Sequence, residues 1–121
     1  MDYKVVSLRA FVGAKNFELS RRFYCALGFT EIQIEPKMSY FHQQGFGFYL
    51  QDYYVQDWVD NTMLFMEVDN VHKFWTFLQT LDLEGKFEGV ELKPVVQDEW
   101  GSECFVRDPC GVCWHFGEFK K

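Results

Sequence analysis

Apolar and polar residues alternate along the chain in patterns that predict strands and helices in a recurring order. Every second residue from position 6 to position 12 is apolar, namely Val6, Leu8, Ala10 and Val12. This period of two predicts a β-strand with one buried face. Asn16 then occupies the N-cap position of a predicted helix, which ends at Gly28. Phe23, Tyr24 and Leu27 are spaced to form one apolar stripe along that helix.

Three strands are predicted after this helix, and a second strand and helix then begin the same order again. Asn70 is expected to cap the second helix, whose apolar stripe comprises Val71, Phe74, Phe77, Leu78 and Leu81. The predicted strands after the first one cover residues 29–35, 39–43, 46–52, 62–68, 91–97, 102–108 and 112–118. Turn residues stand between some of them at Pro36-Lys37, Gln44-Gly45 and Asp108-Pro109-Cys110-Gly111.

The two predicted helices match one another along their length. One constant offset places Asn16 on Asn70 and the apolar stripe of the first helix on that of the second. A match of this kind indicates a duplicated unit. A chain of 121 residues is too short for two independent cores of ordinary size. We therefore expect an α+β fold in a single domain spanning residues 1–121, with half-modules of about 1–58 and 59–121.

The composition is that of a globular protein with an excess of aromatic residues. Hydrophobic residues make up 48% of the chain and charged residues 25%, which favours a folded domain over a disordered one. The chain contains 14 Phe, 6 Tyr and 4 Trp, or 20% aromatic residues. This is more ring area than a core of this size encloses easily. Some of these rings are therefore expected to line a pocket or an interface.

Net charge and hydropathy argue against two classes of partner. The formal net charge of −6 repels a phosphate backbone, so nucleic-acid binding is not expected and cationic partners are favoured. No apolar run approaches the roughly 18 residues of a membrane span, and the first ten residues have no apolar signal core. We therefore expect a cytoplasmic protein whose cysteines stay reduced. These are Cys25, Cys104, Cys110 and Cys113.

Several segments of the sequence resemble the bleomycin-resistance proteins of the glyoxalase (vicinal oxygen chelate) superfamily. They are Phe23-Tyr24-x-x-Leu27-Gly28-Phe29, Asp60-Asn61-Thr62, Trp100-Gly101-x-Glu103 and Arg107-Asp108-Pro109-x-Gly111-x-Cys113-x-His115-Phe116. The resemblance runs nearly end to end. It implies two tandem βαβββ modules that form a U-shaped mixed sheet, or cup, and a homodimer with two shared grooves. It also implies that such a protein binds a large cationic glycopeptide drug without modifying it.

The resemblance also bears on metal binding. Catalytic members of the superfamily hold a divalent metal on His and Glu side chains from four strands, and the matching positions here are Arg9, Leu50, Met63 and His115. Of these only His115 suits a hard metal ion, so no metal, cofactor or catalytic residue is expected. A second cluster, of Cys104, Cys110, Cys113 and His115, has the composition of a zinc site. Strand parity separates Cys104 from Cys113 and His115, which favours structural cysteines.

Strand parity predicts which side chains of the second half face the cup. If the apolar residues at positions 64, 66, 68, 112, 114 and 116 pack under the helices, their alternates face the cup, namely Met63, Phe65, Glu67, Cys113 and His115. Glu103 and Phe105 join them, because they have the opposite parity to Cys104 on their strand. Glu103 is a candidate partner for a ligand cation, although an ordinary exposed carboxylate is an equal alternative. The resemblance implies that Trp100 stacks on the flat heteroaromatic tail of the drug.

The first half offers further candidate ligand contacts. Phe48, Tyr40 and His42 are assigned to one parity and are expected to line the same groove, with core packing as an alternative for Phe48. Arg9 is expected to face the cup and to require an anionic partner there, either Glu67 or Glu103 or a ligand carboxylate. Gln33 stands where the family has an aromatic partner for the stacking tryptophan, and the first strand lacks the proline associated with exchange of the N-terminal arm between subunits.

These expectations lead to one functional prediction and two alternatives. The predicted function is noncovalent binding and sequestration of a cationic, partly aromatic small molecule by a homodimer. The first alternative is an enzyme of the superfamily, either a lyase or dioxygenase with an unconventional metal set around His115 or a metal-free isomerase that uses His115 as acid and base. The second is a superfamily member with an unrelated small-molecule ligand.

Overall fold

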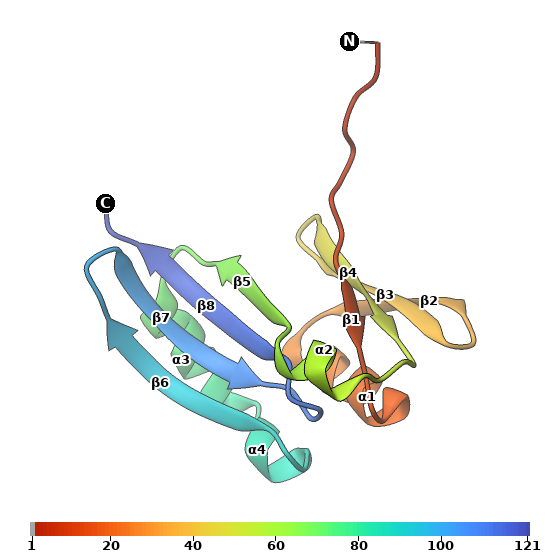
Figure 1. Cartoon of the computed structure of the whole chain (residues 1–121). Coiled ribbons are helices and arrows are strands. Elements are labelled where there is room, and N and C mark those ends of the chain that lie inside the picture. The colour runs from red at the N-terminus through yellow and green to blue at the C-terminus, as the bar shows by residue number, and fades with distance from the viewer. Residues whose placement is uncertain (1) are drawn as a thin grey trace.

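A computed structural model describes residues 2–121 and contains two four-stranded mixed sheets with helices packed against one face of each (Figure 1). The first half comprises β1 (Phe11–Gly13), α1 (Phe17–Leu27), β2 (Thr30–Glu35), β3 (Met38–Gln43) and β4 (Phe46–Gln51). Its strands are ordered β1-β4-β3-β2, with β1 parallel to β4 and the other pairs antiparallel.

The second half repeats this arrangement. The short helix α2 (Gln56–Asp60) leads into β5 (Met63–Glu67), α3 (Val71–Thr80), α4 (Leu83–Lys86), β6 (Glu91–Gln97), β7 (Gly101–Arg107) and β8 (Cys113–Phe119). The strand order is β5-β8-β7-β6, with β5 parallel to β8. The predicted α+β fold of two βαβββ modules is therefore confirmed. No helix of residues 2–121 is both long and apolar enough to cross a membrane.

The helix ends follow from the capping residues that the sequence indicated. The side chain of Asn16 accepts a hydrogen bond from the N–H of Leu19 and so caps α1, while the side chain of Asn70 accepts one from the N–H of Lys73 and caps α3. Gly28 ends α1 with a φ of 119°, in the left-handed region that glycine adopts without strain. The short helices α2 and α4 were not predicted, because they contain too few residues to show a helical period.

A buried polar cluster joins the two halves. The hydroxyl of Tyr24 on α1 donates to Asp108 in the β7–β8 turn at 2.5 Å, and the indole N–H of Trp114 on β8 donates to the Tyr24 oxygen at 2.9 Å. The other Asp108 carboxylate oxygen accepts three backbone N–H groups of residues 110–112. All three side chains are buried. Burial raises the pKa of Asp108 and the hydrogen bonds to its carboxylate oppose that rise.

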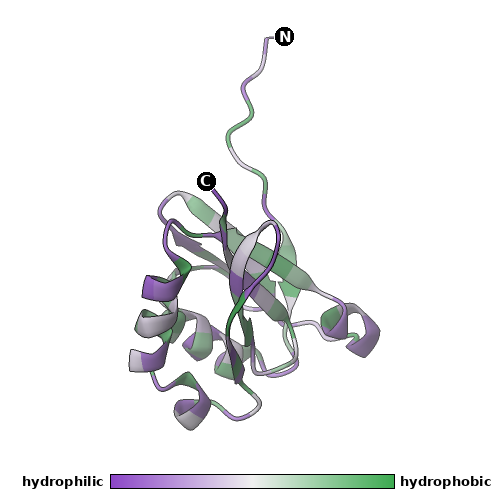
Figure 2. Cartoon of the chain, turned by 90° about the vertical axis from the view of Figure 1, so that its left-hand side faces the viewer, coloured by the Kyte–Doolittle hydropathy of each residue, from purple (hydrophilic) through white to green (hydrophobic). Residues whose placement is uncertain are grey.

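The N-terminal strand is much shorter than the apolar pattern predicted. Strand β1 begins only at Phe11, and residues 2–10 form an extended arm without regular secondary structure that projects from the rest of the chain (Figures 1 and 2). Val6 is 90% exposed and Leu8 is 95% exposed, whereas Val12 is buried. The alternation identifies side chains that suit a buried face, but this single chain has no surface that covers them.

The four cysteines are free thiols in different surroundings. Cys25 is exposed on α1 and Cys113 is half-buried on β8. Cys104 is fully buried, and burial raises the pKa of its thiol to about 11. Cys110 lies in the β7–β8 turn with its sulfur 3.5 Å from the Gly13 carbonyl, and burial together with Asp108 raises its thiol pKa to about 12.

Loss of the Asp108 carboxylate is expected to destabilise the protein strongly. Replacing Asp108 with alanine leaves the Tyr24 hydroxyl and three N–H groups without their acceptor in a buried place, which costs on the order of 3 kcal/mol or more. Urea denaturation of Asp108→Ala measures this cost. Asp52→Ala, at an exposed position, is the control and should change stability by less than about 0.5 kcal/mol. Equal stability of the two variants would contradict the role given to Asp108.

Thiol reactivity should divide the cysteines into two classes, because the thiolate is the reactive form. At pH 8 we expect a thiol reagent to label Cys25 and Cys113 in the native protein, and to label Cys104 and Cys110 only after unfolding. Mass spectrometry of alkylated peptides identifies the labelled sites. Rapid native labelling of Cys110 would show that the turn opens more readily than its hydrogen bonds indicate.

Candidate functional site

The face of each sheet that points away from the helices carries the candidate functional side chains, and we call it the open face. In the second sheet the residues at positions 112, 114 and 116 are buried on the helix side, as predicted. Their alternates form the open face of this sheet, which comprises Met63, Phe65, Glu103, Phe105, Cys113 and His115. The strand register places Met63 beside Cys113, and His115 between Phe65 and Phe105.

His115 is the centre of a polar cluster on this open face. Its Nδ1 lies 2.9 Å from a carboxylate oxygen of Glu103, and its ring packs edge-on against Phe105 at 4.9 Å. Its Nε2 lies 3.4 Å from the Met63 sulfur and 3.8 Å from the Cys113 sulfur. The side chains of His115 and Glu103 are only 23% and 17% exposed. This partial burial strengthens their interaction relative to a surface pair.

The Cys113 thiol experiences opposing influences. Burial raises its pKa, and the cationic side chains of Arg107 and Lys93 counter part of that rise. The thiol therefore lies in a partly buried setting with positive charge nearby. A ligand that requires the thiolate has to displace its proton.

Three aromatic rings form a second cluster at the other end of the same open face. The Trp100 ring lies 5.9 Å from that of Phe65 and 5.2 Å from that of Phe119, and these two are 5.7 Å apart. Gly117 leaves room for them, since a Cβ there would come within 2.6 Å of the Phe65 ring and 3.1 Å of the Trp100 ring. Phe65 and Phe119 are each about half exposed. The cluster offers ring faces to a guest.

The open face of the first sheet is also aromatic. Tyr40 stacks on His42 with ring centres 5.3 Å apart, and Tyr49 lies 5.6 Å from Tyr40. The guanidinium of Arg9 lies 4.0 Å above the Tyr40 ring and donates to the Tyr49 hydroxyl at 2.8 Å. Within residues 2–121 Arg9 forms no ion pair with Glu67 or Glu103, so that part of the prediction is wrong, whereas the alternative of a ligand carboxylate stays a prediction. The buried Nε of Arg9 has no hydrogen-bond partner in the described chain. Cation–π contact and a phenol oxygen take the place of a carboxylate.

Two candidate ligand contacts of the first half lie on the helix side of the sheet. Phe48 is 2% exposed and lies on the helix side, because its partner across the hairpin is the buried Phe41. Gln33 pairs with the buried Ser39 and shares its side of the sheet. Phe48 therefore follows the core-packing alternative, and the ligand role of Gln33 stays a prediction, because the side of a strand depends on its register with a neighbour. Tyr40 and His42 lie on the open face as predicted.

Two aromatic residues of the open faces were missed by the sequence reasoning. Tyr49 lies opposite Tyr40 in the β3–β4 hairpin, and the two-residue turn at positions 44 and 45 would have given this register. Phe119 continues the alternation of Cys113 and His115 along β8, one residue beyond the predicted end of that strand. Both residues could therefore have been found by extending the patterns already present in the sequence.

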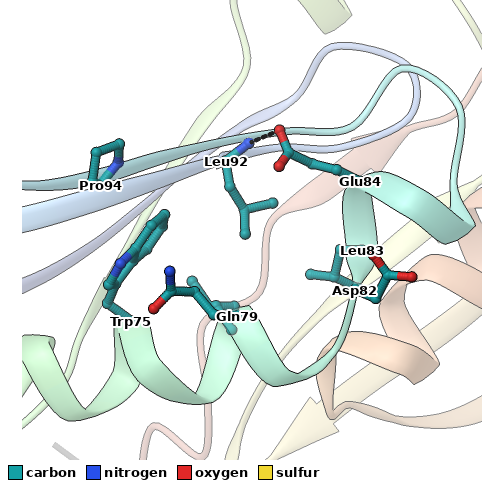
Figure 3. Close-up of a pocket in the computed structure, with 8 residues that line it drawn as sticks. Trp75, Gln79, Asp82, Leu83, Glu84, Leu92 and Pro94 are labelled. Carbon is teal, nitrogen blue, oxygen red and sulfur yellow. Dashed lines mark hydrogen bonds between the residues drawn. The ribbon is translucent and has the colours of Figure 1, made fainter.

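Two hollows are lined mainly by residues outside the open faces, although Phe65 of the open face also lines the larger one. The larger hollow, of about 950 Å³, lies between the β3–β4 turn on one side and β5 and α3 on the other. Its walls include the rings of Phe46, Phe74, Phe77 and Trp114. The other, of about 310 Å³, lies between α3, α4 and β6 (Figure 3). In this smaller hollow the Glu84 carboxylate already accepts the N–H of Leu92 at 3.2 Å.

The residues at the four superfamily metal positions do not fit a hard divalent ion. Leu50 is fully buried on the helix side, and Arg9 carries a positive charge that is held by two tyrosines. Met63 offers a soft thioether, which leaves His115 as the only suitable donor. Within residues 2–121, no three or more His, Cys, Asp or Glu side chains are arranged to hold a metal ion.

Solved structures of other proteins have the same fold as this chain. No family model and no curated protein matches the sequence. The structure is similar to that of a bleomycin-binding protein from Streptomyces verticillus complexed with copper(II)-bleomycin, with a TM-score of 0.78, 20% identity, and coverage of 98% of this chain and 99% of that chain. It is also similar to an antibiotic binding protein from a Streptomyces species, with a TM-score of 0.71, 16% identity, and coverage of 99% of each chain.

The similarity extends to an enzyme. A lactoylglutathione lyase from Agrobacterium tumefaciens matches with a TM-score of 0.69, 13% identity, and coverage of 97% of this chain and 100% of that chain. The structural neighbours therefore include both binding proteins and glyoxalase-type enzymes. Because all these identities are low, they establish the architecture and not the activity. The chain has the fold of the glyoxalase/bleomycin-resistance superfamily.

Proposed function

We propose that this protein binds a cationic, partly aromatic small molecule noncovalently and sequesters it. The observation that carries the proposal is the partly exposed ring cluster of Trp100, Phe65 and Phe119 on the same open face as the Glu103 carboxylate. Ring faces attract both flat heteroaromatic groups and cations. The net charge of −6 adds a field that draws in a positive guest. The similarity to a bleomycin-binding protein and to an antibiotic binding protein supports a small-molecule ligand.

Sequestration sets a requirement on affinity. To hold a free drug below its effective concentration, the protein needs a sub-micromolar dissociation constant, or about −8 kcal/mol. Two or three desolvated aromatic contacts and one charge pair are sufficient when they are concentrated in one place. The Trp100 cluster supplies the rings. The Glu103 oxygen that does not contact His115 remains available for the charge.

We further propose that the working form is a homodimer in which the open faces of two copies complete a shared groove. The arm of residues 2–10 carries Tyr3, Val5, Val6 and Leu8 with large exposed areas. Burying one such aliphatic side chain contributes about 1.5–3 kcal/mol, which favours a second copy as its neighbour. Strand β5 is an edge strand, and edges of this kind are commonly covered in an assembly.

One observation favours a second candidate function. The 2.9 Å contact between His115 and Glu103 is the arrangement of a base held by a carboxylate, and it lies on a face that a substrate can reach. An enzyme of the lyase or isomerase type would use His115 to move a proton. Such an enzyme would convert its ligand, whereas a sequestering protein would release it unchanged. Recovery of the ligand after prolonged incubation, followed by mass spectrometry, separates the two functions.

Ligand binding is expected to depend on Trp100. Calorimetric titration of the protein with metal-free bleomycin should give saturable sub-micromolar binding, and Trp100→Ala should weaken it by at least about tenfold because a stacking contact is lost. Trp75→Phe is the matched control, since Trp75 lies in the small hollow beside α3 (Figure 3) and should not affect binding. Absence of binding by the unmodified protein would remove bleomycin as the guest. Equal affinities of Trp100→Ala and the unmodified protein would show that the ligand binds at another site.

The arm is expected to control the oligomeric state. Analytical ultracentrifugation should find a dimer for the full chain at micromolar concentration and a monomer for Val6→Ser/Leu8→Ser, because four apolar side chains per dimer lose their buried contacts. Ser7→Ala, between them on the arm, should leave the dimer intact. A full chain that sediments as a monomer, or a double variant that stays dimeric, would argue against this role of the arm.

A further inference from the structure

Two soft sulfur atoms and an imidazole nitrogen converge on the open face of the second sheet. The His115 Nε2 lies 3.4 Å from the Met63 sulfur and 3.8 Å from the Cys113 sulfur. Met63 and Cys113 are direct neighbours in the parallel pair of β5 and β8, and Cys113 and His115 are two residues apart on one face of β8. The backbone of two rigid strands therefore brings a thioether, a thiol and an imidazole to one place.

These separations match the edges of a metal coordination polyhedron. Nitrogen and sulfur ligands lie about 2.0 and 2.3 Å from a bound ion, and at bond angles of roughly 110–120° they are then about 3.5–3.7 Å apart. The two nitrogen–sulfur distances of 3.4 and 3.8 Å lie on either side of that range. Small rotations of the side chains would be enough to surround an ion.

Glu103 orients the imidazole for this purpose. Its carboxylate accepts from Nδ1, so that in the neutral ring Nε2 presents a lone pair toward the two sulfur atoms. A thioether sulfur also has only lone pairs to offer, so the 3.4 Å approach of Nε2 and the Met63 sulfur has no shared hydrogen in that state. A cation between them would turn this contact into two bonds. A carboxylate on the distal nitrogen is the usual partner of a metal-bound histidine.

The donor set selects for a soft ion of low charge. A thiolate and a thioether favour Cu(I) over hard divalent ions. Within residues 2–121, no group of three or more His, Cys, Asp or Glu side chains is arranged to hold a metal ion, so hard oxygen ligands do not compete as a set. One thiolate and two neutral ligands form a neutral complex with a monovalent ion. Such a complex is suited to a face flanked by the rings of Phe65 and Phe105. Only two of these donors, Met63 and His115, stand at the superfamily metal positions, and Cys113 stands at none of them.

We propose that Cys113, His115 and Met63 form a binding site for a soft monovalent metal ion, with Cu(I) as the best fit and Glu103 as the residue that positions the imidazole. The proposed site would bind a soft monovalent ion, whereas the catalytic members of the superfamily bind a hard divalent ion. When the ion binds, the Cys113 sulfur loses its proton to solvent and bonds to the metal, and no change in oxidation state is required. The proposal does not depend on any organic guest.

An anaerobic competition titration tests the site. The protein carries a Cys25→Ser substitution throughout, because the exposed Cys25 thiol would itself bind Cu(I). Cu(I) is added in the presence of the colorimetric chelator bicinchoninate, without any organic guest. We expect one Cu(I) per chain. In this background Cys113→Ser, His115→Gln and Met63→Leu should each weaken binding by at least about tenfold, and Glu103→Gln by about 10–100-fold with the stoichiometry unchanged.

Controls distinguish a three-donor site from simple thiol binding. Met38→Leu changes a methionine of the first sheet and should leave Cu(I) affinity unchanged. Circular dichroism and thermal denaturation verify that each variant is folded, which is expected because the donors lie on a partly exposed face. The proposal is overturned if no stoichiometric Cu(I) binds. It is also overturned if Cys113→Ser alone weakens binding, because a single thiol would then account for the result.

Discussion

The buried carboxylate of Asp108 is the constraint on which the arrangement of the two halves depends. It accepts the Tyr24 hydroxyl from α1 of the first half and three N–H groups of its own turn in the second half. Removing a charge from water is costly unless hydrogen bonds replace the lost hydration, and this carboxylate has four such bonds from O–H and N–H groups and a fifth from the Cys110 thiol. The rings of Phe48 and Trp114 then pack against Tyr24 at 5.0 and 5.7 Å. The hydrogen bonds to Asp108 and the packing of these rings together determine how α1 lies against β8.

This buried cluster determines which side chains remain for function. Because Trp114 must reach the Tyr24 oxygen, its neighbours Cys113 and His115 are forced onto the opposite side of β8. The same alternation along β7 leaves Glu103 outside while Cys104 is buried. The core and the open face thus use alternate residues of the same strands. Substitutions on the open face can therefore change binding without removing a core contact.

Much of this arrangement could be predicted from local sequence signals. The caps at Asn16 and Asn70 located both long helices, and the alternation in β7 and β8 assigned Glu103 and His115 to the open face. These signals are reliable because they concern neighbours in the sequence. The predicted half-modules within one domain stay a prediction.

The points that the sequence left open or gave wrongly share a physical cause, which is that they involve partners distant in the sequence. The side taken by Phe48 depends on its register with β3, and the exposure of Leu8 depends on whether another surface covers the arm. Arg9 was expected to need a carboxylate, yet in this chain it contacts two tyrosines of neighbouring strands, because aromatic faces also stabilise a cation, while its Nε has no hydrogen-bond partner. The sequence pattern indicates that a side chain needs a buried surface or a charge partner. The tertiary structure determines which group provides it.

Glu103 is the residue where the two proposed roles of the open face meet. One of its oxygens contacts His115 and would hold the imidazole toward the soft donors, while the same carboxylate is the candidate attraction for a cationic guest. A carboxylate has about four lone-pair positions, so these two interactions do not exclude each other. They are nonetheless linked, because a cation drawn to Glu103 weakens its hold on the imidazole. A guest that binds through stacking on Trp100 alone would leave the donor cluster undisturbed, whereas one that also engages Glu103 would alter it.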